Sequence, residues 1–83
     1  MKSIIVHGPQ GCGKTLNAEA LRVHYGLAHV QDDWSRRDRL PLQDTLVLTH
    51  ETPQALGLDE LGLQIVPYDD AFAAMVAARV ING

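Results

Sequence analysis

Eight consecutive residues near the N-terminus constrain the fold of this 83-residue chain more than any other segment. The run fits the pattern G-x-x-x-x-G-K-[ST] without a mismatch and reads Gly8-Pro9-Gln10-Gly11-Cys12-Gly13-Lys14-Thr15. The apolar, β-branched residues of Lys2–His7 predict a buried strand before it. The apolar spacing of Gly13–Tyr25 predicts a helix after it, which Gly26 ends by adopting the left-handed conformation. The motif therefore lies between a strand and a helix.

The residue types of this phosphate-loop motif (residues 8–15) suit the binding of phosphates. Its glycines let successive backbone N–H groups point at one anion, and a helix N-terminus adds partial positive charge there. Lys14 is long enough to reach the β- and γ-phosphates, and the hydroxyl of Thr15 is a ligand for Mg²⁺. The alternative is a glycine-rich turn that binds nothing.

On these residues the chain resembles the P-loop NTPase superfamily. The loop looks most like the Walker A sequence of AAA-type ATPases and of small P-loop kinases, and the resemblance covers residues 2–25. It implies Mg²⁺ and a nucleoside triphosphate as ligands. The residues implied to bind the nucleotide are Gly8, Gly11, Cys12, Gly13, Lys14 and Thr15. The Asn-Lys-x-Asp stretch by which GTPases of this superfamily select guanine is absent, so we expect ATP.

The remaining segments alternate between strand and helix patterns. We predict strands at 28–31, 45–49 and 63–66, a polar loop at 32–43, and a helix at 69–81 with Phe72, Val76, Val80 and Met75 facing inward. The segment 53–61 fits either a short helix or a turn. Together these predict one α/β domain over residues 1–83. We expect a minimal three-layer P-loop domain whose short, mostly parallel sheet has about four strands flanked by two or three helices.

A P-loop site needs a carboxylate near the end of a strand to hold Mg²⁺ or its water shell. Asp32 and Asp33 follow the predicted strand 28–31, and we expect one of them to contact the metal. Asp33 is also the candidate base of a small-molecule kinase, by resemblance to enzymes of the gluconate and shikimate kinase type. The alternative is a solvated loop, or an aspartate that caps a short helix.

The strand at 45–49 ends in Thr49, where a Walker B sequence would carry Asp. This strand looks more like the polar-ended sensor strand of AAA-type proteins. Thr49 is therefore a candidate sensor of the γ-phosphate or of water, and Glu51 is a candidate for orienting a water or binding the metal through one. Together with Lys14 and Asp33, these two residues form the predicted catalytic set. The alternative is ordinary turn chemistry at a strand end.

Several other polar residues have both a functional and a structural interpretation. Arg36, Arg37 and Arg39 fit an arginine flap or finger, but more simply a solvated loop paired with Asp38. Trp34 fits stacking on a base, but more simply a cap on the core.

The cysteine, the histidines and a pair of aspartates also favour structural roles. Cys12 fits a redox switch, but more simply a small residue in a tight turn. The four histidines lack metal-ligand spacing. Asp69 and Asp70 fit helix capping, or acids on the substrate side of a site.

Composition excludes several other classes of protein. The chain has one cysteine, which excludes an internal disulfide, and no apolar run of ~18 residues that would span a membrane. Its net charge of −3 argues against a sequence-independent binder of nucleic acid or of membrane surfaces. We therefore expect a cytoplasmic chain.

The function predicted from sequence is Mg²⁺-dependent binding of ATP, with slow hydrolysis as a possible enzymatic activity. A chain this short has little room for a lid, so a protein partner or a second copy would complete the site. The alternatives are a nucleotide-responsive binding module without chemistry, and a small-molecule kinase.

Overall fold

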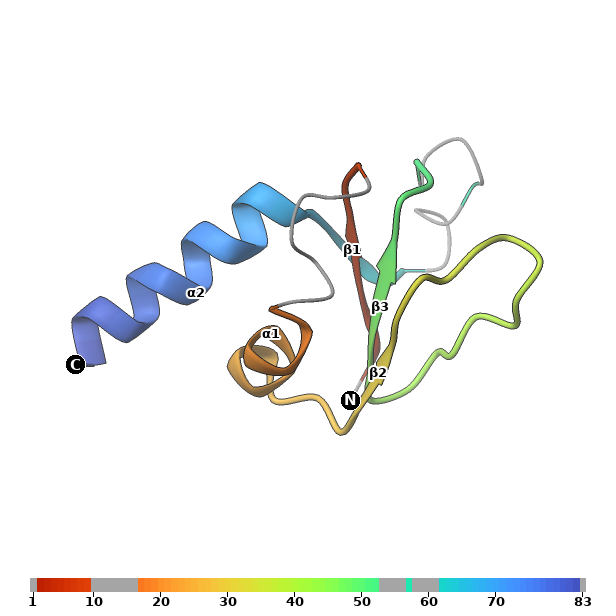
Figure 1. Cartoon of the computed structure of the whole chain (residues 1–83). Coiled ribbons are helices and arrows are strands. Elements are labelled where there is room, and N and C mark those ends of the chain that lie inside the picture. The colour runs from red at the N-terminus through yellow and green to blue at the C-terminus, as the bar shows by residue number, and fades with distance from the viewer. Residues whose placement is uncertain (1, 10–16, 53–56, 58–61, 83) are drawn as a thin grey trace.

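A computed structural model of the chain describes residues 2–9, 17–52, 57 and 62–82 (Figure 1). Four strands and two helices form within these ranges. In chain order they are β1 (Ile4–His7), α1 (Ala18–Tyr25), β2 (His29–Gln31), β3 (Thr45–Thr49), β4 (Gln64–Pro67) and α2 (Tyr68–Asn82). The α/β class predicted from sequence is confirmed.

The four strands form one parallel sheet in the order β2-β3-β1-β4. The strand that precedes the phosphate-loop motif is therefore central, with β3 on one side and β4 on the other. An isolated antiparallel bridge joins Lys2 to Gln43 before the sheet begins. Because all strands run the same way, the segments that follow them meet at one edge of the sheet, where ligands gather in parallel α/β proteins.

Both helices pack on the same face of the sheet (Figure 1). Alternate residues of the central strands point toward them, as the two-residue period of a strand requires. The buried side chains of this main core are Ile4, Val6, Leu21, Leu27, Leu46, Leu48, Tyr68, Ala71 and Met75.

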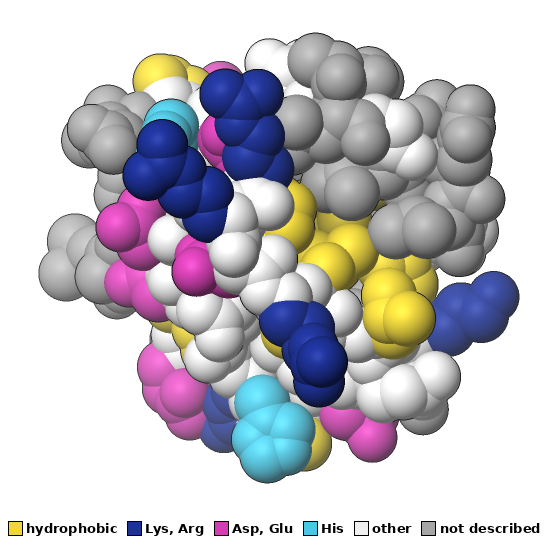
Figure 2. Space-filling model, turned by 90° about the vertical axis from the view of Figure 1, so that its right-hand side faces the viewer, with side chains coloured by type: hydrophobic (Ala, Val, Ile, Leu, Met, Phe, Trp, Pro, Cys, Tyr) yellow, Lys and Arg dark blue, Asp and Glu magenta, His cyan; other side chains and the backbone are white. Residues whose placement is uncertain are grey.

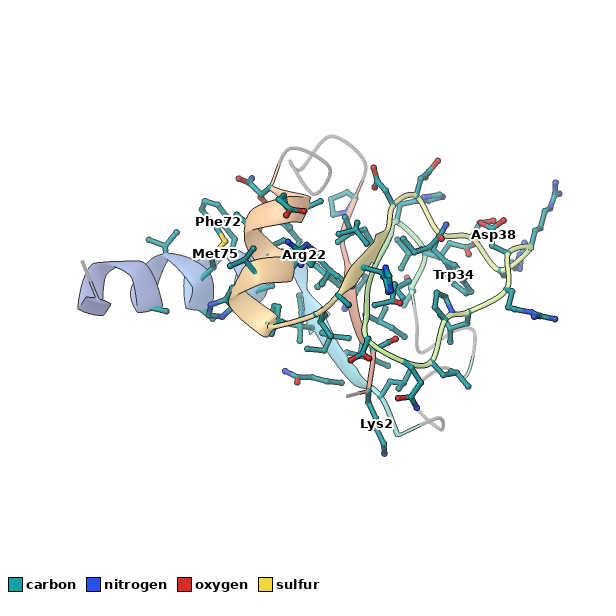
Figure 3. All side chains as sticks on the ribbon, turned by 90° about the horizontal axis from the view of Figure 1, so that it is seen from below. Lys2, Arg22, Trp34, Asp38, Phe72 and Met75 are labelled. Carbon is teal, nitrogen blue, oxygen red and sulfur yellow. The ribbon has the colours of Figure 1, made fainter. Side chains whose placement is uncertain are left out.

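The opposite face of the sheet is covered by a loop. Trp34 packs there on Ile5 and Val47, with Leu40, Leu63 and Ile65 around them. Figure 3 shows Trp34 and Met75 on opposite sides of the sheet. Figure 2 shows hydrophobic side chains at the surface in the middle of this face, with Lys and Arg side chains around them. Within the described ranges no helix covers this face, where a third layer was expected, and the loop that carries Trp34 packs there.

Local sequence signals located most of the elements correctly. Strand β3 has the predicted bounds, and residues 32–43 form a loop. Helix α1 ends at Gly26, whose φ is 70°. The Gly26 and Leu27 amides donate to the carbonyls of Val23 and Arg22, which satisfies the helix end as a Schellman motif does.

The predicted inward face of the last helix is wrong at two positions. Phe72 and Val76 are 37% and 40% exposed, whereas Ala71 and Met75 are buried. The buried stripe of α2 is therefore shifted by one residue, because the face that carries Ala71 and Met75 is the one that packs against the sheet and α1. The side chain of Val80 lies outside the described residues.

None of the helices described is both long enough and apolar enough to cross a membrane.

Candidate functional site

The phosphate-loop motif leaves the sheet at its carboxyl edge, between the ends of β3 and β4. The Gly8 amide donates to the Thr49 carbonyl at 3.1 Å, so the ladder between β1 and β3 extends into the first residue of the motif. The next described residues are Asn17 and the start of α1. Five of the predicted nucleotide-binding residues, Gly11, Cys12, Gly13, Lys14 and Thr15, lie outside the described residues.

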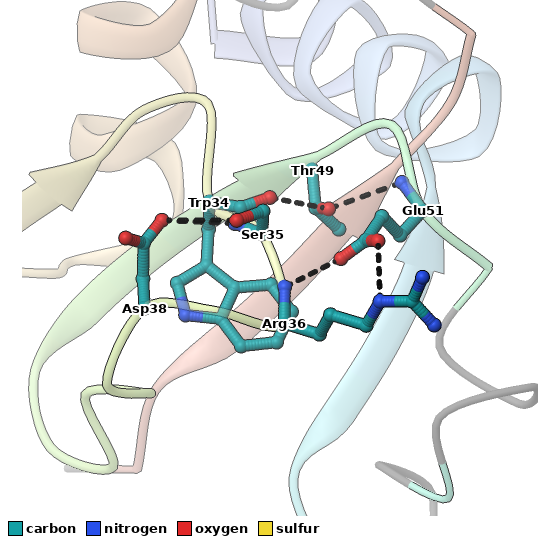
Figure 4. A network of polar contacts seen from close by, with 6 residues as sticks. All are labelled: Trp34, Ser35, Arg36, Asp38, Thr49 and Glu51. Atoms are coloured by element: carbon teal, nitrogen blue, oxygen red, sulfur yellow. Dashed lines mark hydrogen bonds and ion pairs between the residues drawn. The ribbon is translucent and has the colours of Figure 1, made fainter.

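Thr49 joins the end of β3 to the loop that follows β2 (Figure 4). Its side chain is completely buried. The hydroxyl donates to the Trp34 carbonyl at 2.7 Å and accepts from the Glu51 amide at 3.1 Å. The Trp34 amide donates in turn to the Leu48 carbonyl at 2.8 Å. The hydroxyl of this candidate sensor residue therefore uses its proton and one lone pair in hydrogen bonds to the backbone.

Glu51 holds the same loop from the outside (Figure 4). Its carboxylate accepts from the Arg36 amide at 2.6 Å, and the Arg36 Nε lies 3.9 Å from the other carboxylate oxygen. The Glu51 side chain is 21% exposed. In this arrangement the Glu51 carboxylate positions the loop. To contact a metal-bound water as well, it would have to bind that water while it keeps its hydrogen bond to the Arg36 amide.

We expect replacement of Thr49 by valine to lower the free energy of unfolding by about 1–3 kcal/mol, because the Trp34 carbonyl and the Glu51 amide lose their buried partner. Thr49→Ser is the matched control, since it keeps the hydroxyl and removes one methyl group, at a cost of about 1 kcal/mol. Urea denaturation followed by circular dichroism measures both. A Thr49→Val variant as stable as the native chain would mean that the hydroxyl contributes nothing.

The candidate metal ligands lie just beyond β2. Asp32 and Asp33 are exposed, and Asp33 has a φ of 53°, a left-handed conformation that aspartate tolerates better than most residues. The Asp33 carboxylate lies 3.8 Å from Nδ1 of His50, which follows β3 directly.

The carboxylates of Asp32 and Asp33 are oxygen ligands of the kind that Mg²⁺ binds. Among the residues with described positions, no three His, Cys, Asp or Glu side chains converge as a metal group. Mg²⁺ in phosphate sites commonly takes only one or two carboxylates, with water and phosphate oxygens completing its shell. The chemistry of Asp32 and Asp33 fits that role.

The structural interpretation of Trp34 is confirmed. The side chain is 3% exposed, and its indole N–H donates to the Arg39 carbonyl at 3.2 Å. The arginines around it lie on an exposed loop, as expected. Asp38, however, accepts from the Ser35 amide at 3.1 Å, and Arg36 forms an ion pair with Glu51.

A pocket opens on the other side of β1, between the ends of β1 and β4. Its volume is about 300 Å³. Its described walls are His7, Gly8, Pro9, Pro67, Tyr68 and Asp69. The Tyr68 hydroxyl, which accepts from the Asn17 side chain at 2.8 Å, ties the start of α2 to the segment before α1. The pocket therefore shares Gly8 and Pro9 with the phosphate-loop motif.

The two aspartates at the start of α2 have different surroundings. Asp69 lines the pocket, whereas Asp70 acts electrostatically on Tyr25 of α1. Burial, with a further contribution from the Asp70 charge, raises the pKa of the Tyr25 hydroxyl above its ordinary value. Both aspartates also lie in the first turn of α2, where negative charge complements the helix dipole.

The raised pKa of Tyr25 predicts a loss of stability in alkali. Tyr25 ionises more readily in the unfolded chain than in the folded chain, so its contribution is present below the unfolded pKa of ~10 and lost as the pH rises through the folded pKa. We expect the free energy of unfolding to fall more steeply above that pH in the native chain than in Tyr25→Phe. Urea denaturation from pH 8.5 to 11 measures this, and parallel curves would contradict it.

Sequence reasoning gave Pro67 and Tyr68 no place in a site. The pocket depends on β4 lying beside β1, and strand order cannot be read from the pattern of one chain. The only signal was that Asp69 follows a predicted strand, at the edge where ligands collect.

Comparisons of the chain with protein-family models, curated proteins and solved structures found no match.

Proposed function

We propose that this chain is a minimal P-loop domain that binds Mg²⁺ and a nucleoside triphosphate, with ATP as the expected nucleotide, through residues 8–15. The observation that carries the proposal is the place of the complete motif. It follows the central strand of a parallel sheet at the carboxyl edge and precedes a helix. That context is the one in which such a motif cradles phosphates.

The residues that would hold Mg²⁺ are Thr15 and one of Asp32 and Asp33. The ion would neutralise charge on the phosphates and polarise the terminal phosphoryl group. The protein's contribution is to orient the phosphates with loop amides and Lys14. Slow hydrolysis is the expected activity where water is not excluded from the bound phosphates.

A second candidate function is a nucleotide-responsive binding module without chemistry. The engagement of Thr49 and Glu51 favours it, since two candidate catalytic groups hold the loop of Trp34 and Arg36. The Gly8 amide donates a hydrogen bond to the Thr49 carbonyl, so a shift of the motif on phosphate binding would be transmitted through Thr49 to that loop.

Calorimetric titration with Mg-ATP, Mg-GTP and ADP tests the proposal, followed by a phosphate-release assay on the same samples. Binding of the triphosphates supports the P-loop function. Release of phosphate then identifies an NTPase, and binding without product identifies the module. Absence of binding by the folded chain would overturn both.

A further inference from the structure

The pocket between β1 and β4 has a composition unlike that of the rest of the carboxyl edge. On the β3 side of the motif, charged side chains lie close together, namely Asp33 with His50 and Glu51 with Arg36. On the β4 side, Pro9, Pro67 and Tyr68 supply largely apolar walls, His7 supplies an imidazole, and Asp69 supplies a single carboxylate. The two sides of the motif therefore suit different chemical groups.

We propose that this pocket binds the second substrate of a phosphoryl-transfer reaction, a neutral sugar-like ring or polyol whose hydroxyl group accepts the phosphoryl group. The proposal rests on the proposed function, because the phosphate donor is the nucleotide bound at residues 8–15. The pocket shares Gly8 and Pro9 with that motif, so a molecule in it lies directly against the start of the phosphate-binding loop.

The size and walls of the pocket select the class of acceptor. A volume of about 300 Å³ is at the lower limit for small-molecule sites, which suits a single ring. The C–H faces of a sugar pack on proline and aromatic side chains, and its hydroxyl groups donate hydrogen bonds to a carboxylate. Tyr68 is held in place by its bond to Asn17, so the wall is preorganised.

The charges at the pocket argue for a neutral acceptor. Its described lining contains one carboxylate, Asp69, the imidazole of His7, and no Lys or Arg. An acceptor that carries its own carboxylate would be repelled. An anionic acceptor would instead call for a cationic side chain in the lining.

Asp69 would act as the base in the transfer step. The oxygen of the acceptor hydroxyl forms a bond to the terminal phosphorus of ATP, and the bond from that phosphorus to the bridging oxygen breaks. ADP leaves with that electron pair, and the hydroxyl proton passes to the Asp69 carboxylate.

The test measures ADP and phosphorylated product after incubation with Mg-ATP and one of D-glucose, D-ribose, myo-inositol or glycerol. D-gluconate and shikimate serve as anionic comparators. We expect at least one neutral compound to raise ADP formation about tenfold or more above the rate without acceptor.

Two variants locate the step. Asp69→Asn is expected to lower transfer by about 100-fold, as loss of a general base does, while Mg-ATP affinity stays within about twofold. Asp70→Asn is the matched control, because it removes the same charge from the next position, where it acts on Tyr25. Circular dichroism and the urea midpoint verify that both variants fold.

Each other outcome overturns the inference in a distinguishable way. If Mg-ATP binds but none of the four neutral compounds is phosphorylated, the acceptor pocket is wrong and the nucleotide site stands. Transfer to the anionic comparators alone would contradict the acceptor class, and transfer unaffected by Asp69→Asn would contradict the location. Absence of Mg-ATP binding would overturn both proposals.

Discussion

Replacement of Trp34 by alanine is expected to lower the free energy of unfolding by about 3–5 kcal/mol, the usual cost of removing a buried aromatic side chain. Trp34 is 3% exposed and covers Ile5 and Val47 on the face of the sheet opposite the helices. Its indole N–H also holds the Arg39 carbonyl. Domains of this size are stable by roughly 5–10 kcal/mol, so the loss would remove a large share of the total.

Trp34→Phe is the control for this prediction. It keeps an aromatic ring over Ile5 and Val47 and removes the N–H donor, so we expect a loss of about 1–2 kcal/mol. Urea denaturation followed by far-ultraviolet circular dichroism compares the two. If the alanine variant loses no more stability than the phenylalanine variant, Trp34 is not the principal cover of this face.

Replacement of Lys14 by alanine is expected to have the largest effect on ligand binding. If the Lys14 ammonium makes charge-assisted hydrogen bonds to the terminal phosphates, its loss should cost about 2–4 kcal/mol, or roughly 30- to 1,000-fold in Mg-ATP affinity. ADP lacks the γ-phosphate, so its affinity should fall less. Calorimetric titration measures both.

Lys2 supplies a matched control for the Lys14 variant, because the chain has only these two lysines. Lys2 is exposed and lies before β1, at the end of the sheet opposite the phosphate-loop motif (Figure 3). Lys2→Ala should leave the affinity within about twofold. Equal losses in the two variants would point to general electrostatic attraction, and no loss in either would remove Lys14 from the site.

Trp34 supplies a second measurement for the same titration, since it is the sole tryptophan. Its carbonyl accepts from Thr49, whose own carbonyl accepts from the Gly8 amide. Binding of phosphate at the motif should therefore change the tryptophan emission, and Lys14→Ala should shift the midpoint of that change to higher nucleotide concentration.

Strand β3 and helix α2 differ in how well the sequence predicted them. Strand β3 was predicted with its bounds, because a run of β-branched and apolar residues between turn signals leaves few alternatives. On α2, Met75 was correctly predicted to face inward, but Phe72 and Val76 were not. The first turns of α2 are rich in alanine and apolar side chains, so several faces of the helix are equally apolar, and contact with β1, β4 and α1 determines which one is buried.

The candidate site was predictable to different degrees. The motif at residues 8–15 was evident from sequence because its chemistry depends on residues adjacent in the chain. The hydrogen bonds of Thr49 and Glu51 were not evident from sequence, because their partners in the Trp34 loop lie fifteen residues away in the chain. The pocket at Asp69 also required the structure, because it forms only where two strands far apart in the chain become neighbours.

The sequence by itself determined the α/β class, most strand positions, the end of α1 at Gly26 and the place of the phosphate-loop motif. Each of these follows from periodicity, or from a backbone conformation that few residues adopt. The tertiary structure alone decided the strand order, the packing of the Trp34 loop on one face of the sheet, and the different surroundings of Asp69 and Asp70. These depend on packing between segments distant in the chain, for which local residue patterns carry no information.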